Sequence, residues 1–309
     1  LKAWVIVHLL SALFSPNQEA PGGFVFNMSI GYDLAGIQSP AMDRYIERLI
    51  SAEGDSMYGG ILDEAGSFLA TEKAKRFFGD NWEKAKKFLS LIPSKITRSV
   101  TLSTMHGCPP SEIEQICAYL LTEKKLNTYV KLNPTLLGYD KARRTLDSLG
   151  YSYIDLKRES FTKDLQMDDA IPMLRRLKKL SDSKQVLFGL KLSNTLGSRN
   201  TDGPLSGDEK YMSGRALYPL TVNLSSLLAA EFNGILPISF AGGISQYTVL
   251  DIAKTGIRPI TVATSLLKPG GYPRLAKIAA ITEEAWDTLP QSVDQDALKN
   301  LAESVLKSP

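Results

Sequence analysis

The stretch that decides the fold runs from residue 99 to residue 138 and reads SVTLSTMHGCPPSEIEQICAYLLTEKKLNTYVKLNPTLLG. A short apolar strand around Val100 and Leu102 ends in a polar loop, and a second strand follows at residues 128–132. Between them, two prolines and the capping-box pattern that begins at Ser111 predict the start of a helix. The stretch is therefore a βαβ unit, which is typical of a parallel sheet whose strand ends carry the functional groups.

The same alternation of strands and helices continues on both sides of this unit. The strand candidates are residues 24–30, 100–103, 128–132, 153–156, 186–192, 236–240 and 259–263. Helices are expected to begin near Ser111, Asp140, Asp168, Ser213, Ser245 and Pro273. Seven strands alternating with helices predict an α/β fold, with the (β/α)8 TIM barrel as its natural large member. Because the chain opens on a helix, we expect the barrel to be N-terminally incomplete.

The chain divides into a barrel and a tail on this interpretation. Residues 1–285 are expected to form the (β/α)8 barrel, with a helical insertion at about 56–95. The insertion contains the Lys-rich runs 72–76 and 83–87, which favour a solvated helix face. Residues 286–309 are expected to form a C-terminal surface helix or tail.

Composition limits the classes of partner and the compartment. The 309 residues carry 36 Lys and Arg against 33 Asp and Glu, a net charge of +3 that argues against nucleic acid and anionic membranes as partners. The apolar segment 1–14 is interrupted by Lys2 and His8 and is too short for a membrane span. The near-balanced charge favours a small-molecule or protein partner instead. Since only two cysteines occur, Cys108 and Cys117, we expect reduced thiols in a cytoplasmic protein.

Two strands of the predicted sheet each carry a lysine between apolar neighbours. Lys131 and Lys191 alternate with residues that point to the helix-covered face of the sheet, so both side chains point to the opposite face. Each lysine then either binds a ligand or pairs with a carboxylate at the barrel mouth. The sequence leaves both alternatives open.

Two later strand ends are typical of a phosphate site. Gly242 and Gly243 end one strand, and Thr264 and Ser265 end the next. Glycines let backbone amides approach an anion, and in barrels the phosphate site commonly lies at two neighbouring late strand ends. The alternative for the glycine pair is a tight turn between a strand and a helix.

The polar loop of the first βαβ unit contains further reactive groups. Cys108 follows a glycine and precedes two prolines at a helix start, so it is either a low-pKa thiolate or a small residue that fills the loop. The only histidines are His8 and His106, and no His, Cys and carboxylate spacing predicts a zinc site. No G-x-S-x-G elbow of a serine hydrolase is present.

Six segments together resemble a known family. The similarity is to the FMN-barrel portion of the bacterial proteins named "putative selenate reductase subunits", which are similar to dihydropyrimidine and dihydroorotate dehydrogenase-like proteins. It covers residues 24 to about 276. The segments are TLSTMHGCPPSEIE, VKLNPTLLGY, KLSNTLG, EKYMSGRALYPL, PISFAGG and ITVATSLLKPGGY.

The resemblance implies a barrel of the FMN-linked oxidoreductase type and assigns roles by motif. It leaves open whether Lys131 or Lys191 faces the flavin, and it places Thr104 at the acid/base position where relatives carry Cys or Ser. The implied cofactor-binding residues are Lys131, Lys191, Asn194, Thr195, Ser213, Gly214, Gly242, Gly243, Thr264 and Ser265. The candidate catalytic residues are Thr104, His106, Cys108 and Asn133.

The function implied is transfer of electrons or hydride between FMN and a small, nitrogenous ring substrate, within a larger multidomain electron-transfer protein. Full-length relatives continue into reductase and iron–sulfur parts that use FAD and NADPH, whereas this sequence has no G-x-G-x-x-G motif and no cysteine cluster. Two alternatives stay open. One is a flavin-free lyase or aldolase that forms a Schiff base on a lysine, and the other is a non-catalytic barrel that docks redox partners.

Overall fold

The computed structural model describes residues 1–16, 19–104, 107–201 and 206–307. The backbone divides into two compact units, each considered by itself. Unit 1 comprises Leu1–Met28 and Ala35–Val100, and unit 2 comprises Ser29–Leu34 and Thr101–Pro309.

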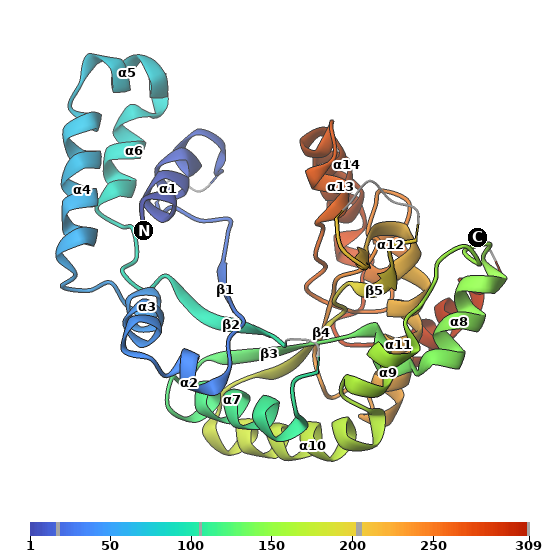
Figure 1. The fold of residues 1–309 in the computed structure, drawn as a ribbon. Coiled ribbons are helices and arrows are strands. Elements are labelled where there is room, and N and C mark those ends of the chain that lie inside the picture. The colour runs from blue at the N-terminus through green and yellow to red at the C-terminus, as the bar shows by residue number, and fades with distance from the viewer. Residues whose placement is uncertain (17–18, 105–106, 202–205, 308–309) are drawn as a thin grey trace. The chain divides into compact units, whose positions relative to one another are not determined.

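Unit 1 is built from helices. They are α1 (Lys2–Phe14), α3 (Pro40–Ile50), α4 (Ser56–Leu69), α5 (Glu72–Phe78), the 3-10 turn η1 (Gly79–Asn81) and α6 (Trp82–Leu89). Helix α1 packs against α4 and α6, which lie alongside each other in Figure 1. Helices α4 to α6 occupy the region where the Lys-rich periodicity predicts helices. In the part of the chain that the structure describes, no helix combines the length and the apolar character that a membrane span requires.

Side-chain caps explain where the helices of unit 1 begin. Asp55 accepts a hydrogen bond from the amide of Tyr58 at 2.9 Å, and Thr71 accepts one from the amide of Ala74 at 3.2 Å. Each cap satisfies an amide that has no partner within the first helical turn. The chain then passes into unit 2 within β1 (Phe26–Ile30), returns to unit 1 within α2 (Leu34–Ile37), and crosses again within β2 (Thr97–Ser103).

Unit 2 contains the parallel sheet that the sequence predicts. The strand order is β1-β2-β3-β4-β7, and β1 and β2 contribute residues 29–30 and 101–103 to this unit. Strands β3 (Asn127–Leu132), β4 (Phe188–Leu192) and β7 (Ile238–Phe240) are paired in parallel. Lys131 is in register with Lys191, and Lys191 with Ser239. The predicted α/β class is therefore confirmed.

Helices cover one face of this sheet. Helices α7 and α10 pack against each other and contact β3 and β4, as Figure 1 shows. Val130, Leu132, Leu190 and Leu192 are all buried. The alternation along a strand then directs Lys131 and Lys191 to the opposite face.

The helices of unit 2 are α7 (Pro110–Thr122), α8 (Tyr139–Ser148), α9 (Arg158–Lys163), α10 (Met167–Lys184), α11 (Leu217–Glu231), α12 (Val249–Ala253), α13 (Thr264–Leu267), α14 (Gly271–Ala285) and α15 (Gln295–Ser304), with 3-10 turns η2 (Pro134–Leu137), η3 (Gly214–Ala216) and η4 (Trp286–Thr288).

Two strand predictions are corrected by the structure. Residues 153–156 form no strand, and only Leu156 makes an isolated bridge, to Ser198. The Arg143 guanidinium donates to the carbonyl oxygens of Tyr151 and Ile154, so a side chain satisfies backbone groups that a sheet would otherwise pair. Residues 259–263 likewise form only the bridge from Ile260 to Phe240.

An antiparallel hairpin that the sequence does not predict follows β4. It consists of β5 (Leu196–Arg199) and β6 (Glu209–Met212), with Gly197 opposite Tyr211. A Cβ atom at Gly197 would lie 2.5 Å from the Glu209 carboxylate, so a larger residue at this position of the hairpin would displace that side chain. The hairpin carries the chain from the end of β4 to the Ser213-Gly214 turn.

Candidate functional site

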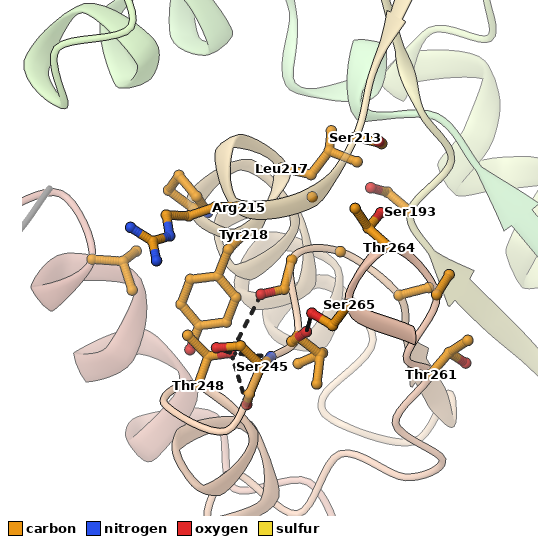
Figure 2. A pocket seen from close by; sticks show the side chains of 18 of the residues that line it. Ser193, Ser213, Arg215, Leu217, Tyr218, Ser245, Thr248, Thr261, Thr264 and Ser265 are labelled. Atoms are coloured by element: carbon orange, nitrogen blue, oxygen red, sulfur yellow. Dashed lines mark hydrogen bonds between the residues drawn. The ribbon is translucent and has the colours of Figure 1, made fainter. Parts of the chain in front are cut away.

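A cavity of about 840 Å³ lies in unit 2 on the face of the sheet that carries the two lysines. Figure 2 shows part of its wall, including Ser193, Ser213, Thr264 and Ser265. Every residue that the sequence nominates for cofactor binding lines this cavity. These residues are Lys131, Lys191, Asn194, Thr195, Ser213, Gly214, Gly242, Gly243, Thr264 and Ser265.

Lys131 and Lys191 form a cationic pair at the sheet. Both side chains are half-buried, and neither forms an ion pair in the described part of the chain. Burial lowers the pKa of both lysines, and the positive charge of Lys191 lowers that of Lys131 further. The structure thus gives no support to a carboxylate partner at the barrel mouth.

Strands β3 and β4 pack closely at one glycine, two residues before the lysines. Gly189 is in register with Tyr129, two residues before Lys191 and Lys131 respectively. A Cβ atom at Gly189 would lie 2.6 Å from the Tyr129 ring, which therefore lies across the glycine. Burial also raises the pKa of Tyr129, so this phenol stays neutral beside the two amines.

Two glycine turns come together at another part of the cavity wall. Gly214 and Gly243 have φ angles of +77° and +68°, in the region that favours glycine. A Cβ atom at Gly243 would lie 2.8 Å from the Gly214 carbonyl oxygen and 2.8 Å from the Tyr218 Cβ. A Cβ atom at Gly242 would collide with the Thr221 hydroxyl. Close approach of two backbone segments therefore requires glycine here, and leaves a cradle lined by main chain.

The glycine pair does not open a helix directly, contrary to the sequence interpretation. Helix α12 begins only at Val249, and it has five residues. The intervening turn is closed by its own side chains, since the Ser245 amide donates to the Thr248 hydroxyl at 2.9 Å and the Tyr247 amide to the Ser245 hydroxyl at 3.2 Å. No helix N-terminus therefore lies directly at the glycine pair, and α11 is the long helix that begins beside the cradle.

Hydroxyl and amide side chains along the wall are held by local hydrogen bonds. The Ser193 and Thr221 hydroxyls lie 2.8 Å apart, and Ser265 donates to the Ile244 carbonyl at 2.9 Å. Asn194 accepts the Thr195 amide at 3.0 Å. These contacts fix the rotamers of the wall, so the polar atoms that face the cavity are preorganised.

Six charged or phenolic residues in the cavity were not nominated from the sequence, and two of them are Tyr151 and Tyr247. Arg215 and Tyr218 lie just after the Gly214 turn, Asp251 lies on α12, and Lys268 follows α13. Together with the lysine pair, the lining contains four cationic side chains and one carboxylate. Arg215 and Tyr218 could have been found, because they follow Ser213-Gly214 within the first helical turn.

Tyr218 contributes a buried polar atom. Tyr218 is buried, with only 8% of its surface exposed. Among the described residues, its hydroxyl nevertheless has no hydrogen-bond partner. Burial raises the pKa of Tyr218, and the negative charge of Asp251 raises it further, so the phenol stays protonated. Figure 2 shows the ring directed toward Thr248. A buried hydroxyl without a partner is costly, which is typical of a wall that faces a polar ligand.

The candidate catalytic residues lie around a separate, much smaller cavity of about 10 Å³. The Thr104 hydroxyl donates to the Lys131 carbonyl oxygen at 2.9 Å, which fixes the strand end beside the lysine. Asn133 also lines the small cavity, and His106 lies outside the described residues. The structure therefore does not bring Thr104, Cys108 and Asn133 into the wall of the large cavity.

A buried carboxylate that the sequence did not indicate organises this second cluster. Asp164 accepts hydrogen bonds from the Gly107 amide at 2.9 Å, from Asn133 Nδ2 at 3.0 Å and from the Thr135 hydroxyl at 2.8 Å. Asp164 follows α9 in a segment without a recognisable motif. Its bonds join the loop after β2 to the end of β3.

The environment of Cys108 disfavours a thiolate. Its sulfur lies 3.8 Å from Glu112 Oε2. Burial, followed by the negative charge of Glu112, raises the pKa of the Cys108 thiol to about 11. Both cysteines are free thiols, and Cys117 is fully buried. Of the two alternatives for Cys108, the structure supports the small residue that fills the loop.

Comparisons with known proteins identify relatives across the whole chain. A family model described as "Oxidoreductase YgfK, N-terminal TIM-barrel domain" matches residues 1–309. Two curated proteins named "Putative oxidoreductase YgfK", from Escherichia coli strain K12 and Escherichia coli O157:H7, are each 47% identical over 310 residues. The alignment covers 99% of this chain, which spans only 30% of the length of each relative.

A structural comparison finds a weaker likeness. The solved structure of a ligand-free type DHODH from Eimeria tenella is 14% identical in sequence, with a TM-score of 0.34. The match covers 62% of this chain and 63% of that protein.

Proposed function

Because the chain belongs to the family of N-terminal TIM-barrel domains of oxidoreductase YgfK, we propose that its large cavity binds FMN and passes electrons or hydride to or from a small substrate. The observation that carries the proposal is the convergence of a cationic strand pair, a glycine cradle and fixed hydroxyls on one cavity of about 840 Å³. Cofactor pockets are of this size and typically gather a few convergent polar groups. The family membership supports the oxidoreductase class, and the cavity supports the cofactor.

The residues of the cavity fit the parts of FMN. The cradle at Gly214 and Gly243 would hold the phosphate, since it combines exposed main chain with the neighbouring Ser213 and Thr264 side chains. Arg215 would contribute charge to the same region. When bound, FMN would supply the hydride and electron chemistry that the amino-acid side chains lack.

The part of the cavity wall around the end of β4 fits the flavin ring system of FMN. Asn194, held by the Thr195 amide, would orient the flavin, and the lysine pair would face its carbonyl oxygens. A thiolate mechanism at Cys108 has no support from its surroundings, because burial and the negative charge of Glu112 raise the pKa of this thiol and it lines the small cavity instead. The protein's part in the reaction is then to bind, orient and electrostatically stabilise the reacting groups.

A titration with two flavins tests the proposal. Riboflavin lacks the phosphate of FMN, so the cradle predicts that FMN binds at least tenfold more tightly than riboflavin. Flavin fluorescence and calorimetry would give both affinities at fixed ionic strength. Equal affinities would contradict the phosphate assignment, and failure of both flavins to bind would reject the proposed function.

One observation favours a second candidate function. A half-buried lysine whose pKa is lowered by burial and by a second cation is suited to Schiff-base formation. In that case the cradle would bind the phosphate of a carbonyl substrate. Borohydride trapping of a phosphorylated aldehyde on Lys131 or Lys191, in a protein that does not retain flavin, would support this candidate.

The proposal also concerns the partner with which this barrel exchanges electrons. This chain spans 30% of the length of each curated relative, so its electron partner is a separate part of the proposal. We propose that reductase and iron–sulfur parts exchange electrons with the flavin of this barrel, as the sequence resemblance implies. The oxidoreductase description of the family supports this arrangement.

A further inference from the structure

The large cavity extends beyond the phosphate cradle. Its lining continues from the Gly214 turn into the first turn of α11, along α12 and to the end of α15. We call this region the outer part of the cavity. Its main residues are Arg215, Tyr218, Tyr247, Asp251, Leu301 and Val305.

The outer part shares a wall with the cradle. A Cβ atom at Gly243 would lie 2.8 Å from the Tyr218 Cβ and 3.2 Å from the Arg215 Cα, so both residues adjoin the cradle directly. In Figure 2 their side chains point away from Thr264 and Ser193. Ser193 directly follows β4, the strand that we assign to the flavin ring. A phosphate in the cradle would therefore lie between the ring side and the outer part.

The polar side chains of the outer part are not used by the fold. Among the described residues, neither the Arg215 guanidinium nor the Asp251 carboxylate forms a hydrogen bond or an ion pair, although both line the same cavity. The buried Tyr218 hydroxyl has no partner either. On the ring side, by contrast, the hydroxyls of Ser193 and Ser265 are held by local hydrogen bonds. Unpaired polar groups that converge on a cavity are available to a ligand.

The groups of the outer part match the parts of a nucleoside phosphate. A guanidinium such as that of Arg215 binds phosphate oxygens in pairs. A carboxylate such as that of Asp251 accepts hydrogen bonds from the hydroxyls of a ribose. Tyr247 is 76% exposed, and an exposed tyrosine ring is a platform on which a base can stack. Leu301 and Val305 add apolar surface.

We propose that the outer part binds the adenosine phosphate half of a flavin dinucleotide, so that this cavity accepts FAD as well as FMN. The inference rests on the proposed function, because the flavin phosphate in the cradle joins the two halves. One phosphate of the dinucleotide would lie in the cradle, and the other at Arg215. A cavity that ended at the cradle would exclude FAD, since the second phosphate and the nucleoside would meet its wall.

A comparison of FAD with FMN tests this inference. Binding of each flavin to the full chain, freed of bound flavin, would be measured by fluorescence and calorimetry at fixed ionic strength. We expect FAD to bind within threefold of FMN, or more tightly. Val305→Trp, which fills the outer part, and Asp251→Ala, which removes its carboxylate, should each weaken FAD binding at least tenfold. The same variants should change FMN binding less than threefold.

The control is Asn300→Trp, which places the same large ring at an exposed position of α15 outside the cavity and should alter neither affinity. Wild-type binding of FAD more than threefold weaker than that of FMN, or unchanged FAD affinity in both cavity variants, would overturn the inference. A protein that binds FMN but not FAD rejects only the inference. A protein that binds neither flavin, but binds ADP with an affinity that Val305→Trp lowers, rejects the proposed function and upholds the nucleotide site.

Discussion

At the scale of single residues, the lysine pair links the function of the cavity to its stability. A lysine whose pKa is lowered in the folded chain favours the unfolded state while it is charged. The unfavourable contribution is therefore complete below the folded pKa, and it disappears as the pH rises from the folded pKa to the ordinary value of 10.5. Groups arranged for binding commonly have such a stability cost.

We predict that Lys131→Met and Lys191→Met each raise the free energy of unfolding of the ligand-free protein. The gain at pH 7 should be about 0.5–1 kcal/mol, a modest value because the half-buried amines remain partly screened by water. Urea unfolding at several pH values would measure it, and the gain should shrink as the pH rises toward 10.5. A loss of stability at pH 7 in both variants would show that the amines have favourable partners.

Also at this scale, the sequence was informative about strand residues and less so about loop residues. The alternation of a strand fixes the face to which Lys131 and Lys191 point, and parallel strands end at one edge of the sheet. No such rule directs a loop side chain, so the position of Cys108 in a separate small cavity could not be predicted. Asp164 had no sequence signal at all.

At the scale of elements, Asp164 joins the loop after β2 to the end of β3. Among the described residues, its carboxylate accepts hydrogen bonds from two side chains at the end of β3 and from the Gly107 amide. The residue is 5% exposed, so water cannot replace these bonds. The loop that holds Thr104 against the Lys131 backbone is therefore anchored by a buried carboxylate.

Asp164→Asn is predicted to lower the free energy of unfolding by about 2–3 kcal/mol, because an amide nitrogen would replace an acceptor oxygen among three donors. Urea unfolding would measure the loss, and faster hydrogen exchange at the Gly107 amide would locate it. Asp168→Asn, at an exposed position in the first turn of α10, serves as the control and should cost less than about 1 kcal/mol. Equal losses in the two variants would contradict the anchoring role.

The element scale also shows where periodicity is insufficient. Residues 153–156 satisfy the strand pattern, but Arg143 bonds the neighbouring carbonyl oxygens and Tyr153 is 77% exposed. The hairpin of β5 and β6 was missed because its short strands lack the apolar alternation of the sheet strands. In both segments, backbone groups are paired outside the parallel sheet, which periodicity does not reveal.

At the scale of the whole molecule, the (β/α) pattern predicted the α/β class, and the family model identifies the TIM barrel across residues 1–309. Which helices pack together to form units 1 and 2 depends on tertiary contacts, and helical periodicity does not contain that information. The domain boundaries expected from the sequence stay a prediction. All ten residues nominated for cofactor binding line one cavity of unit 2, which is where we place the proposed function.

The central claim is that this cavity binds FMN through the cradle at Gly214 and Gly243. Its most direct test is the ratio of FMN to protein, measured by absorbance after denaturation, in the wild type, in Gly243→Ala and in Gly59→Ala. A Cβ atom at Gly243 would meet the Gly214 carbonyl, whereas one at Gly59 meets no atom within 4 Å. Circular dichroism would verify folding of each variant. We predict about one FMN per chain in the wild type and in Gly59→Ala, and at least a tenfold lower ratio of FMN to protein in folded Gly243→Ala. Absence of FMN from the wild type, even after reconstitution, would contradict the account.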